Sequence, residues 1–489
     1  MEPNPHPLRF SRARKVSLAA CAITIAWDGP ALAAGPLPAE GQIIETSEYR
    51  IDMYQGPILS SARSTGLGGS TAAIAEGVDG MPVNAAAPAV RAPWSVDYYD
   101  YDVGIGFTTA SALNQTDFDN NGRIAFDDGT NRGDTSYERF LFATIGATFQ
   151  WGKWGVGLSV DSQNYRLGEM PIVPDAPPNL QVTLSRANVL LARSYWDQSL
   201  VVGAGLRGAT LDITATENVN GSGQKVRLVE MTGGGLQCGF VYASPTLPMR
   251  LGLTWRSRVR GVTKEGSRAQ TTPEGDTIIG NRYLPTEVAL PWEVEAGIAY
   301  QFGPRPLNVH WIDPHQEVEQ YARKLRAKLP APQDPSYEAR EQELDRQIEA
   351  HEERVRRRLK ARYANTSRQK VLVSASLLVA GPIDEGVGIE SFLRQRVERS
   401  GRWVTLQPRL GVEIEPVENE LQVRVGSYVE PSRFDQHIVR AHGTAGFDFR
   451  ILEWSVFSLF DEDTSWRVGA VVDGAQRYLS IGLSAGIWH

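Results

Sequence analysis

An acidic stretch between residues 117 and 128 has the spacing of a calcium-binding loop. Its first, third and fifth positions carry oxygen side chains, and Gly122 stands at the sixth, where the chain must turn. A hard cation prefers several oxygen ligands that converge on one point. We therefore predict a Ca²⁺ site, with a polar loop that binds no metal as the alternative. The expected ligands are Asp117, Asp119, Asn121, the carbonyl oxygen of Arg123, and Asp128 in place of the usual glutamate.

Five charged residues are spaced so that they could pair across two strands. Arg256, Arg258 and Arg260 alternate along one predicted strand, and Glu293 and Glu295 alternate along the next. Side chains two residues apart share a face of a strand, so opposite charges on adjacent antiparallel strands can meet. The arginines have two alternative roles. They form a structural lattice of ion pairs, or they bind an anionic head group such as a fatty carboxylate, with Arg256 and Arg258 as the first candidates.

Motifs for enzymatic chemistry are weak in this chain. The sequence has no H-E-x-x-H, G-x-S-x-G or P-loop pattern. His442 is the one histidine expected on an inward strand face, so a hydrolase built around it is an alternative that we do not favour. Of the two cysteines, Cys21 lies in an N-terminal segment that we expect to be removed on export. Only Cys238, in a predicted strand, would then remain. We expect neither an internal disulfide nor a cysteine-based metal site.

The elements that must position these residues are mostly strands. From Trp94 to the C-terminus, apolar residues alternate with polar residues or glycine, as they do between Leu141 and Phe149. We count about fourteen such segments, and their length suits a bilayer better than a sandwich. Tryptophans at many predicted strand ends indicate an aromatic girdle at a membrane surface, although ordinary core tryptophans are the alternative. These are Trp94, Trp151, Trp154, Trp196, Trp454, Trp466 and Trp488.

The lengths of the connections support this interpretation. Short turns such as Gly152-Lys153 alternate with long polar loops such as 114–137, which is typical of an outer-membrane barrel with short periplasmic turns. The connection 303–369 breaks this rule. Asp313-Pro314 and Asp334-Pro335 each have the pattern of a helix start, so we predict a helical insert on the periplasmic side. The insert either docks a periplasmic protein partner or packs only on itself.

The N-terminus has the features of an export signal. Basic residues between Arg9 and Lys15 precede an apolar stretch from Val16 to Trp27, and Ala31-Leu32-Ala33 fits a cleavage site. A lipoprotein signal ending at Cys21 is the alternative. Hydrophobic residues make up 42% of the chain, and no run approaches the roughly 20 apolar residues of a membrane-spanning helix. The formal net charge is -7 with no basic patch that would indicate nucleic-acid binding.

A small, glycine-rich stretch, residues 63–89, follows the export signal. Gly66, Gly68 and Gly69 permit a tight backbone path, and a short apolar run follows. We interpret it as a segment packed inside a larger shell, with a mobile linker as the alternative. The stretch resembles the N-terminal hatch of the FadL family of outer-membrane transporters, where an arginine, a G-x-G-G run and an Asn-Pro-Ala element precede the first strand. Here three alanines separate Asn84 from Pro88.

The expected fold class is all-β: a transmembrane antiparallel β-barrel of about 14 strands with an N-terminal hatch and a helical periplasmic insert. The expected divisions are a signal peptide (1–33), an N-terminal extension with the hatch (34–93), and the barrel (94–489) containing the insert (303–369). The resemblance implies a protein that is not an enzyme and that lies in the lipid of a Gram-negative outer membrane.

The resemblance also implies passive uptake of hydrophobic compounds such as long-chain fatty acids. One alternative is a non-transporting barrel that acts as a scaffold or shuttle for a secretion or envelope assembly through its periplasmic insert. A soluble, exported, β-rich calcium-binding protein is a third interpretation, which the alternation of loop lengths disfavours.

Overall fold

The computed structural model describes most of the chain after residue 36. The described residues are 37–91, 95, 97–110, 117–122, 135–169, 180–219, 222–265, 269–279, 282–309, 311–329, 334–364, 366–434, 438–456 and 464–488. The predicted signal peptide, its cleavage site and Cys21 lie outside them. No helix in these parts is long and apolar enough to cross a membrane.

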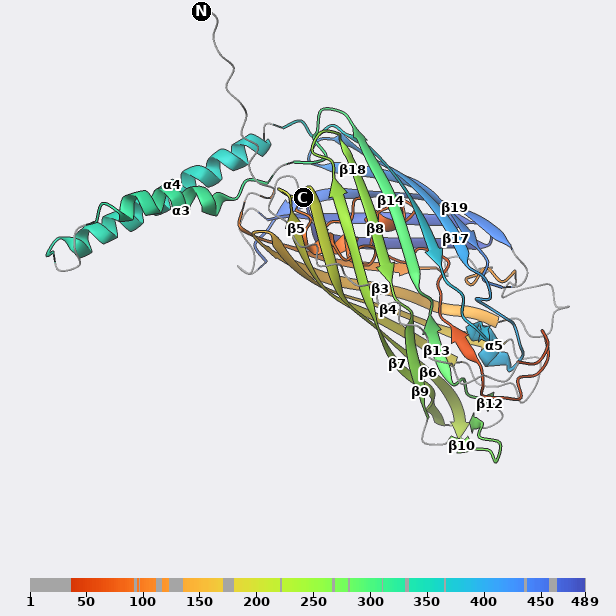
Figure 1. The fold of residues 1–489 in the computed structure, drawn as a ribbon. Coiled ribbons are helices and arrows are strands. Elements are labelled where there is room, and N and C mark those ends of the chain that lie inside the picture. Colours follow the sequence, from red (N-terminus) through yellow and green to blue (C-terminus); the bar gives the residue numbers. More distant parts are fainter. Residues whose placement is uncertain are drawn as a thin grey trace, which may run out of the picture. The chain divides into compact units, whose positions relative to one another are not determined.

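Fourteen antiparallel strands form a closed barrel, as predicted (Figure 1). The barrel closes where the first wall strand, β2, pairs with the last, β21, from Gly104 opposite Gly486 to Thr109 opposite Ile481. Two wall strands are interrupted, so that β8 continues as β9 and β13 continues as β14. The strands are β2 (Tyr99–Thr109), β3 (Thr135–Trp151), β4 (Trp154–Glu169), β5 (Leu180–Tyr195), β6 (Leu200–Val219), β7 (Ser222–Ala243), β8 (Met249–Arg256), β9 (Val259–Glu265), β13 (Glu287–Leu290), β14 (Glu293–Phe302), β15 (Val371–Ala380), β17 (Thr405–Val417), β18 (Leu421–Pro431), β19 (Val439–Glu453), β20 (Ser465–Ala475) and β21 (Tyr478–Ile487).

The outer faces of the wall strands carry an apolar band with a clear upper edge. On β4, Val156, Leu158 and Val160 point outward and are exposed, while the glycines and Ser159 between them point inward. Beyond Asp161 the two faces exchange character. Tyr165 and Leu167 are buried inside, and the outward side chains become polar. The strands therefore extend from a lipid-facing band into a region that has an apolar interior, as a water-soluble domain has.

The apolar interior of this outer region is filled by the chain itself. The strand β1 (Arg50–Asp52) pairs in parallel with β13 on one side and with β16 (Gly386–Val387) on the other. The short helix α5 (Ile389–Arg394) follows β16, and its Phe392 is fully buried. A small separate sheet is formed by β10 (Gln270–Thr271), β11 (Thr277–Ile279) and β12 (Arg282–Tyr283).

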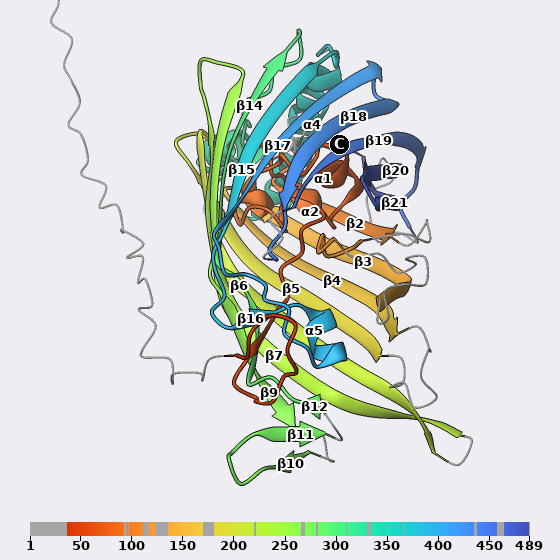
Figure 2. The ribbon, with the colours of Figure 1, turned by 90° about the vertical axis from the view of Figure 1, so that its right-hand side faces the viewer.

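Residues 56–91, which we call the inner segment, contact the inward faces of the wall strands. They contain the short helices α1 (Ala62–Gly66), α2 (Gly77–Gly80) and η1 (Ala87–Ala89), and Figure 2 shows α1 and α2 among the wall strands. Wall glycines allow the close approach. A Cβ atom on Gly203 of β6 would lie 1.9 Å from the carbonyl oxygen of Ala85, and one on Gly252 of β8 would lie 2.1 Å from that of Ala72. The wall at these positions has room only for glycine.

Two helices occupy the connection between β14 and β15, at the end of the barrel that carries the short turns. The helix α3 (Pro314–Arg326) begins after Asp313, whose carboxylate accepts a hydrogen bond from the backbone N–H of His315. The helix α4 (Tyr337–Ala364) packs beside α3 (Figure 1), and Val355 and Leu359 are buried between them. The alternation of loop lengths has exceptions at the other end: only two residues separate β6 from β7, and a two-residue turn joins β20 to β21.

Candidate functional site

Arg256 connects the barrel wall to the inner segment. Its Nε lies 2.6 Å from a carboxylate oxygen of Glu293, and its Nη2 lies 3.3 Å from one of Glu295. Its Nη1 donates hydrogen bonds to the carbonyl oxygens of Pro82 and Val83, at 3.1 and 3.0 Å. The pairing across β8 and β14 that the spacing predicted is therefore present. These contacts tie the guanidinium of Arg256 to Glu293 and Glu295 of the wall and to the backbone of the inner segment.

Arg258 and Arg260 do not share the face of Arg256, and this part of the prediction was wrong. The chain leaves the ladder at Ser257 and Arg258, between β8 and β9. Arg258 donates to the carbonyl oxygen of Pro382. Before the break the even-numbered residues point inward, and after it the odd-numbered ones do. Val259 is therefore fully buried, whereas the side chain of Arg260 is 40% exposed and lies 3.4 Å from Glu287. A one-residue change of register moves every later side chain to the opposite face.

A cavity of about 140 Å³ lies between the inner segment and the wall around Arg256. Its charged lining is rich in arginine, because four arginines face three carboxylates there. Several buried polar atoms of its lining residues form no hydrogen bond with any described residue, and they include Oε1 of Gln237, Oγ of Ser60 and Nη1 of Arg207. Buried polar groups normally have partners, so this cavity suits a polar guest. The charged residues are Arg186, Arg207, Arg256, Arg409, Asp161, Glu293 and Glu295.

The apolar core of the outer region borders this charged cavity. Phe142 of β3 and Leu290 of β13 belong to that core and also line the cavity. Above them the inward side chains of the wall are apolar, and residues 37–53 and 383–397 pack against these side chains. The packed apolar interior of the outer region therefore lies directly against the arginine-rich cavity. The wall members of the core include Tyr165, Leu167, Leu180, Val182, Leu184, Leu211, Ile213, Val229 and Met231.

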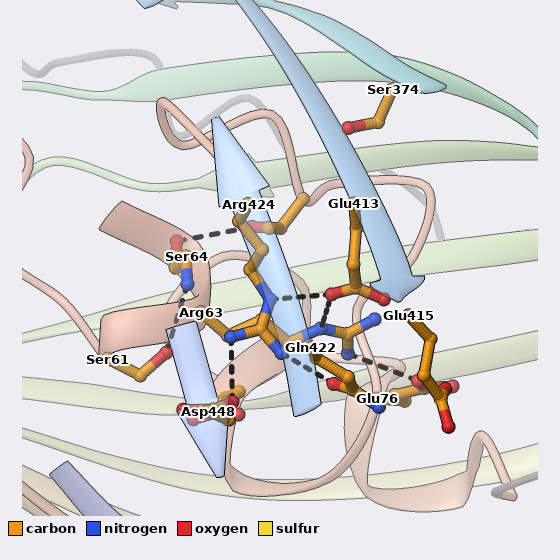
Figure 3. A network of polar contacts seen from close by, with 12 residues as sticks. Ser61, Arg63, Ser64, Glu76, Ser374, Glu413, Glu415, Gln422, Arg424 and Asp448 are labelled. Atoms are coloured by element: carbon orange, nitrogen blue, oxygen red, sulfur yellow. Dashed lines mark hydrogen bonds and ion pairs between the residues drawn. The ribbon is translucent and has the colours of Figure 1, made fainter. Parts of the chain in front are cut away.

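Beneath the inner segment, on the side of the short turns, the lumen is filled by an ion-pair network (Figure 3). Arg424 lies 2.7 Å from both Glu413 and Asp448, and it is 1% exposed. Arg63 of the inner segment lies 3.1 Å from Glu413 and from Glu76. A cavity of about 90 Å³ within the network is lined by six basic and six acidic side chains. Moving an apolar molecule through this network would require separating buried ion pairs, which is costly.

His442 has a structural role. Its Nδ1 lies 2.8 Å from Asp473 and its Nε2 lies 2.7 Å from Glu430, and the ring stacks on Tyr428. Both ring nitrogens are therefore engaged, and the residue is 2% exposed. A buried imidazole held in this way is not placed to act on a substrate.

The first half of the predicted calcium loop folds as a tight turn. The carboxylate of Asp117 accepts hydrogen bonds from the backbone N–H groups of Asn121 and Gly122, at 3.0 and 2.9 Å. Burial raises the pKa of Asp117 to about 6. The Asn121 amide binds Glu390 of α5. Arg123 and Asp128 lie outside the described residues, and within those residues no group of three His, Cys, Asp or Glu side chains could hold a metal ion. Calcium binding stays a prediction.

This chain has similarity to solved structures but not to curated sequences. No protein-family model and no curated protein sequence matches this chain. Several solved structures do. They include the Ralstonia pickettii toluene transporter TbuX (11% identity, 88% of this chain and 97% of the other, TM-score 0.45). The monoaromatic hydrocarbon channel CymD matches at 10% identity over 89% and 97% (TM-score 0.46), and a Pseudomonas aeruginosa FadL homologue at 10% over 91% and 99% (TM-score 0.47).

In fold, the chain resembles the FadL-type barrels. The closed wall and its outward apolar band place it in the outer membrane of a Gram-negative envelope. The sequence signal for the arginine-rich cavity was weak. Arg256 stood out because it alternates with Arg258 and Arg260 in the sequence, whereas Arg186 and Arg207 have no such pattern around them. Each stands among small or apolar neighbours on a long strand, and their convergence depends on how the barrel closes.

Proposed function

We propose that this protein is a passive outer-membrane channel for hydrophobic molecules that carry an acidic head group, such as long-chain fatty acids. The observation that carries the proposal is the order of surfaces in the lumen. The packed apolar interior of the outer region meets an arginine-rich cavity at Phe142 and Leu290, so movement of the segments that fill this interior would open an apolar route to the arginines. An amphiphile would match both surfaces at once, with its chain against the apolar side chains and its carboxylate near the arginines.

Arg207 is the best candidate to receive the carboxylate. Its Nη1 is buried and forms no hydrogen bond within the described residues, and its nearest acidic partner, Glu293, lies 3.6 Å away. Glu293 is shared with Arg256, which holds it more closely at 2.6 Å. A carboxylate ligand could therefore bind Arg207 without displacing the contacts that hold the inner segment. Arg256 then serves as a support for the site and not as the ligand contact.

The exit route that we propose leads through the wall. The ion-pair network below the inner segment opposes the passage of an apolar chain through the lumen. In contrast, the wall ladder is interrupted beside the cavity, where residues 257–258 and 291–292 lie outside the strands. The interruption is bounded by Arg256 opposite Glu293 and by Val259 opposite Leu290. Cargo that moved sideways here would enter the lipid band directly, without crossing the network.

Fatty-acid binding by the purified barrel tests this proposal. Wild-type protein in detergent should bind radiolabelled oleate about tenfold more tightly than oleyl alcohol, because a charge-assisted hydrogen bond contributes roughly 1.5 kcal/mol or more. Arg207→Gln should remove the preference. Arg227→Gln is the matched control, because Arg227 lies on the outward face of β7 with a 55% exposed side chain. Failure of the wild-type barrel to bind either compound, or to support their uptake by cells, would sink the proposal.

A non-transporting scaffold is the second candidate function, and the filled lumen favours it. Residues 37–53 and 383–397 occupy the outer region, and the ion-pair network occupies the other end. A scaffold would use its periplasmic insert to hold a secretion or envelope assembly. In the uptake assay a scaffold would show no transport in any variant, whereas deletion of α3 and α4 would disrupt the partner assembly in the envelope.

A further inference from the structure

The two helices of the insert carry strongly separated charges. Residues 354–364 of α4 contain six basic side chains and no acidic one, whereas residues 337–353 contain seven acidic and two basic ones. We call residues 354–364 the basic stem. Most of its charged side chains are exposed, with Arg357 at 75% and Arg358 at 61% of the side chain. The basic side chains are Arg354, Arg356, Arg357, Arg358, Lys360 and Arg362.

Contacts fix the height of the basic stem relative to the wall. The Nε of Arg356 lies 2.9 Å from a carboxylate oxygen of Asp97, two residues before β2 begins. The neighbouring Tyr98 packs against His315 of α3, with ring centroids 4.3 Å apart. In an α-helix each residue advances about 1.5 Å, so every basic residue of the stem lies within about 9 Å of Arg356 along the axis.

The same part of the wall shows where the membrane surface lies. Tyr99 is 59% exposed and stacks on Phe149, which stacks in turn on Trp151. Aromatic side chains at strand ends lie at the level of the lipid head groups. The pair Arg356–Asp97 stands immediately beside this row of rings. The basic stem is thus held at the height of the head groups on the periplasmic side.

We propose that the basic stem binds anionic phospholipid head groups of the periplasmic leaflet. Arg356 pairs with Asp97, and Arg357 and Arg358 pair with Glu353 and Glu317 on an exposed surface, where ion pairs are weak and offset only part of the charge. Each basic residue near an anionic surface adds attraction that falls off within a Debye length. This interaction would hold the hairpin against the membrane and turn its acidic half towards the periplasm.

Quenching of a single fluorophore tests the proposal on the full chain. Ala361 is exposed within the stem, so Ala361→Cys in a Cys238→Ser background places a dye there. The barrel is reconstituted in nanodiscs of phosphatidylcholine alone or mixed with phosphatidylglycerol, each with a head-group spin label. Quenching should be at least about twofold stronger with phosphatidylglycerol and should fall in about 0.5 M salt, where the Debye length is roughly 4 Å.

Charge reversals provide matched controls. The triple variant Arg354→Glu, Arg357→Glu, Arg362→Glu should lose the effect of phosphatidylglycerol. Reversing the charges of Lys324, Arg326 and Lys328 also changes three charges, but at the C-terminal end of α3, away from the basic stem. This variant should keep the effect of phosphatidylglycerol. Heat-modifiable gel mobility confirms that each barrel is folded. Equal quenching in both lipids would overturn the proposal. The proposal would also be overturned if the dye became immobilised only after a periplasmic extract was added, because the stem would then bind a protein and not the lipid.

Discussion

Arg256 of the wall donates a hydrogen bond to the carbonyl oxygen of Val83 in the inner segment, at 3.0 Å. The same guanidinium pairs with Glu293 at 2.6 Å and Glu295 at 3.3 Å. One side chain therefore joins two wall strands and the segment that they enclose. Its loss would affect both the wall and the inner segment, and the two effects can be measured separately.

Arg256→Ala should destabilise the folded barrel. Removing one partner of a buried ion pair leaves an uncompensated charge and costs about 3 kcal/mol. Glu295 would keep one partner in the variant, because Arg409 lies 3.1 Å from it, and this limits the loss of stability. The temperature at which the barrel loses its fast mobility in a gel should fall clearly for Arg256→Ala and stay unchanged for the exposed Arg227→Ala. Equal temperatures for the two variants would contradict the role assigned to Arg256.

Gly203→Ala should displace the inner segment and open a leak. The added Cβ would lie 1.9 Å from the carbonyl oxygen of Ala85, which is backbone and cannot rotate away. Cells that carry this variant should become more sensitive to bulky antibiotics. Gly443→Ala is the matched control, because nothing lies within 4 Å of a Cβ at that position. If sensitivity were the same for both variants, the inner segment would not be the barrier.

The predicted calcium loop gives a direct binding measurement. The purified barrel should bind ⁴⁵Ca²⁺, and Asp117→Asn should reduce binding at least about tenfold, because position 1 supplies a charged ligand. Asp128→Asn should have a similar effect, although Asp128 lies outside the described residues. Asp384→Asn, in another outer loop, serves as the control. Undiminished calcium binding by Asp117→Asn would assign any bound ion to another site.

The pair Glu317–Arg358 should contribute little to the helical insert, and only above acidic pH. The hydrogen bond from Arg358 lowers the pKa of Glu317 below its usual value of 4.5. A carboxyl with a lowered folded pKa stabilises the fold above its unfolded pKa and loses that contribution as the pH falls. Because both side chains are substantially exposed, Glu317→Gln should cost less than about 0.5 kcal/mol. Hydrogen exchange in α3 at pH 7 measures this cost, and a severalfold larger effect would be inconsistent with an exposed pair.

The sequence alone determined the features that depend on local pattern. The alternation of Val156, Leu158 and Val160 identified a strand with one lipid-facing side, and it did so because successive side chains of a strand point to opposite faces. The Asp313-Pro314 pair marked the start of α3 for a similar reason, since a helix cap is formed by neighbouring residues. The strand number, the closed barrel and the outer-membrane location followed from many such patterns.

Only the tertiary structure decided which side chains meet. The break at Ser257 and Arg258 turns Arg260 outward, and no local pattern announces that change of register. The exchange of faces beyond Asp161, and the partners of His442, depend on strands that are distant in the chain. Whether a charged side chain supports the wall, holds the inner segment or remains available to a ligand is set by its neighbours in space. The sequence contains these residues but does not show which of them contact each other, because the contacts form only when the barrel closes.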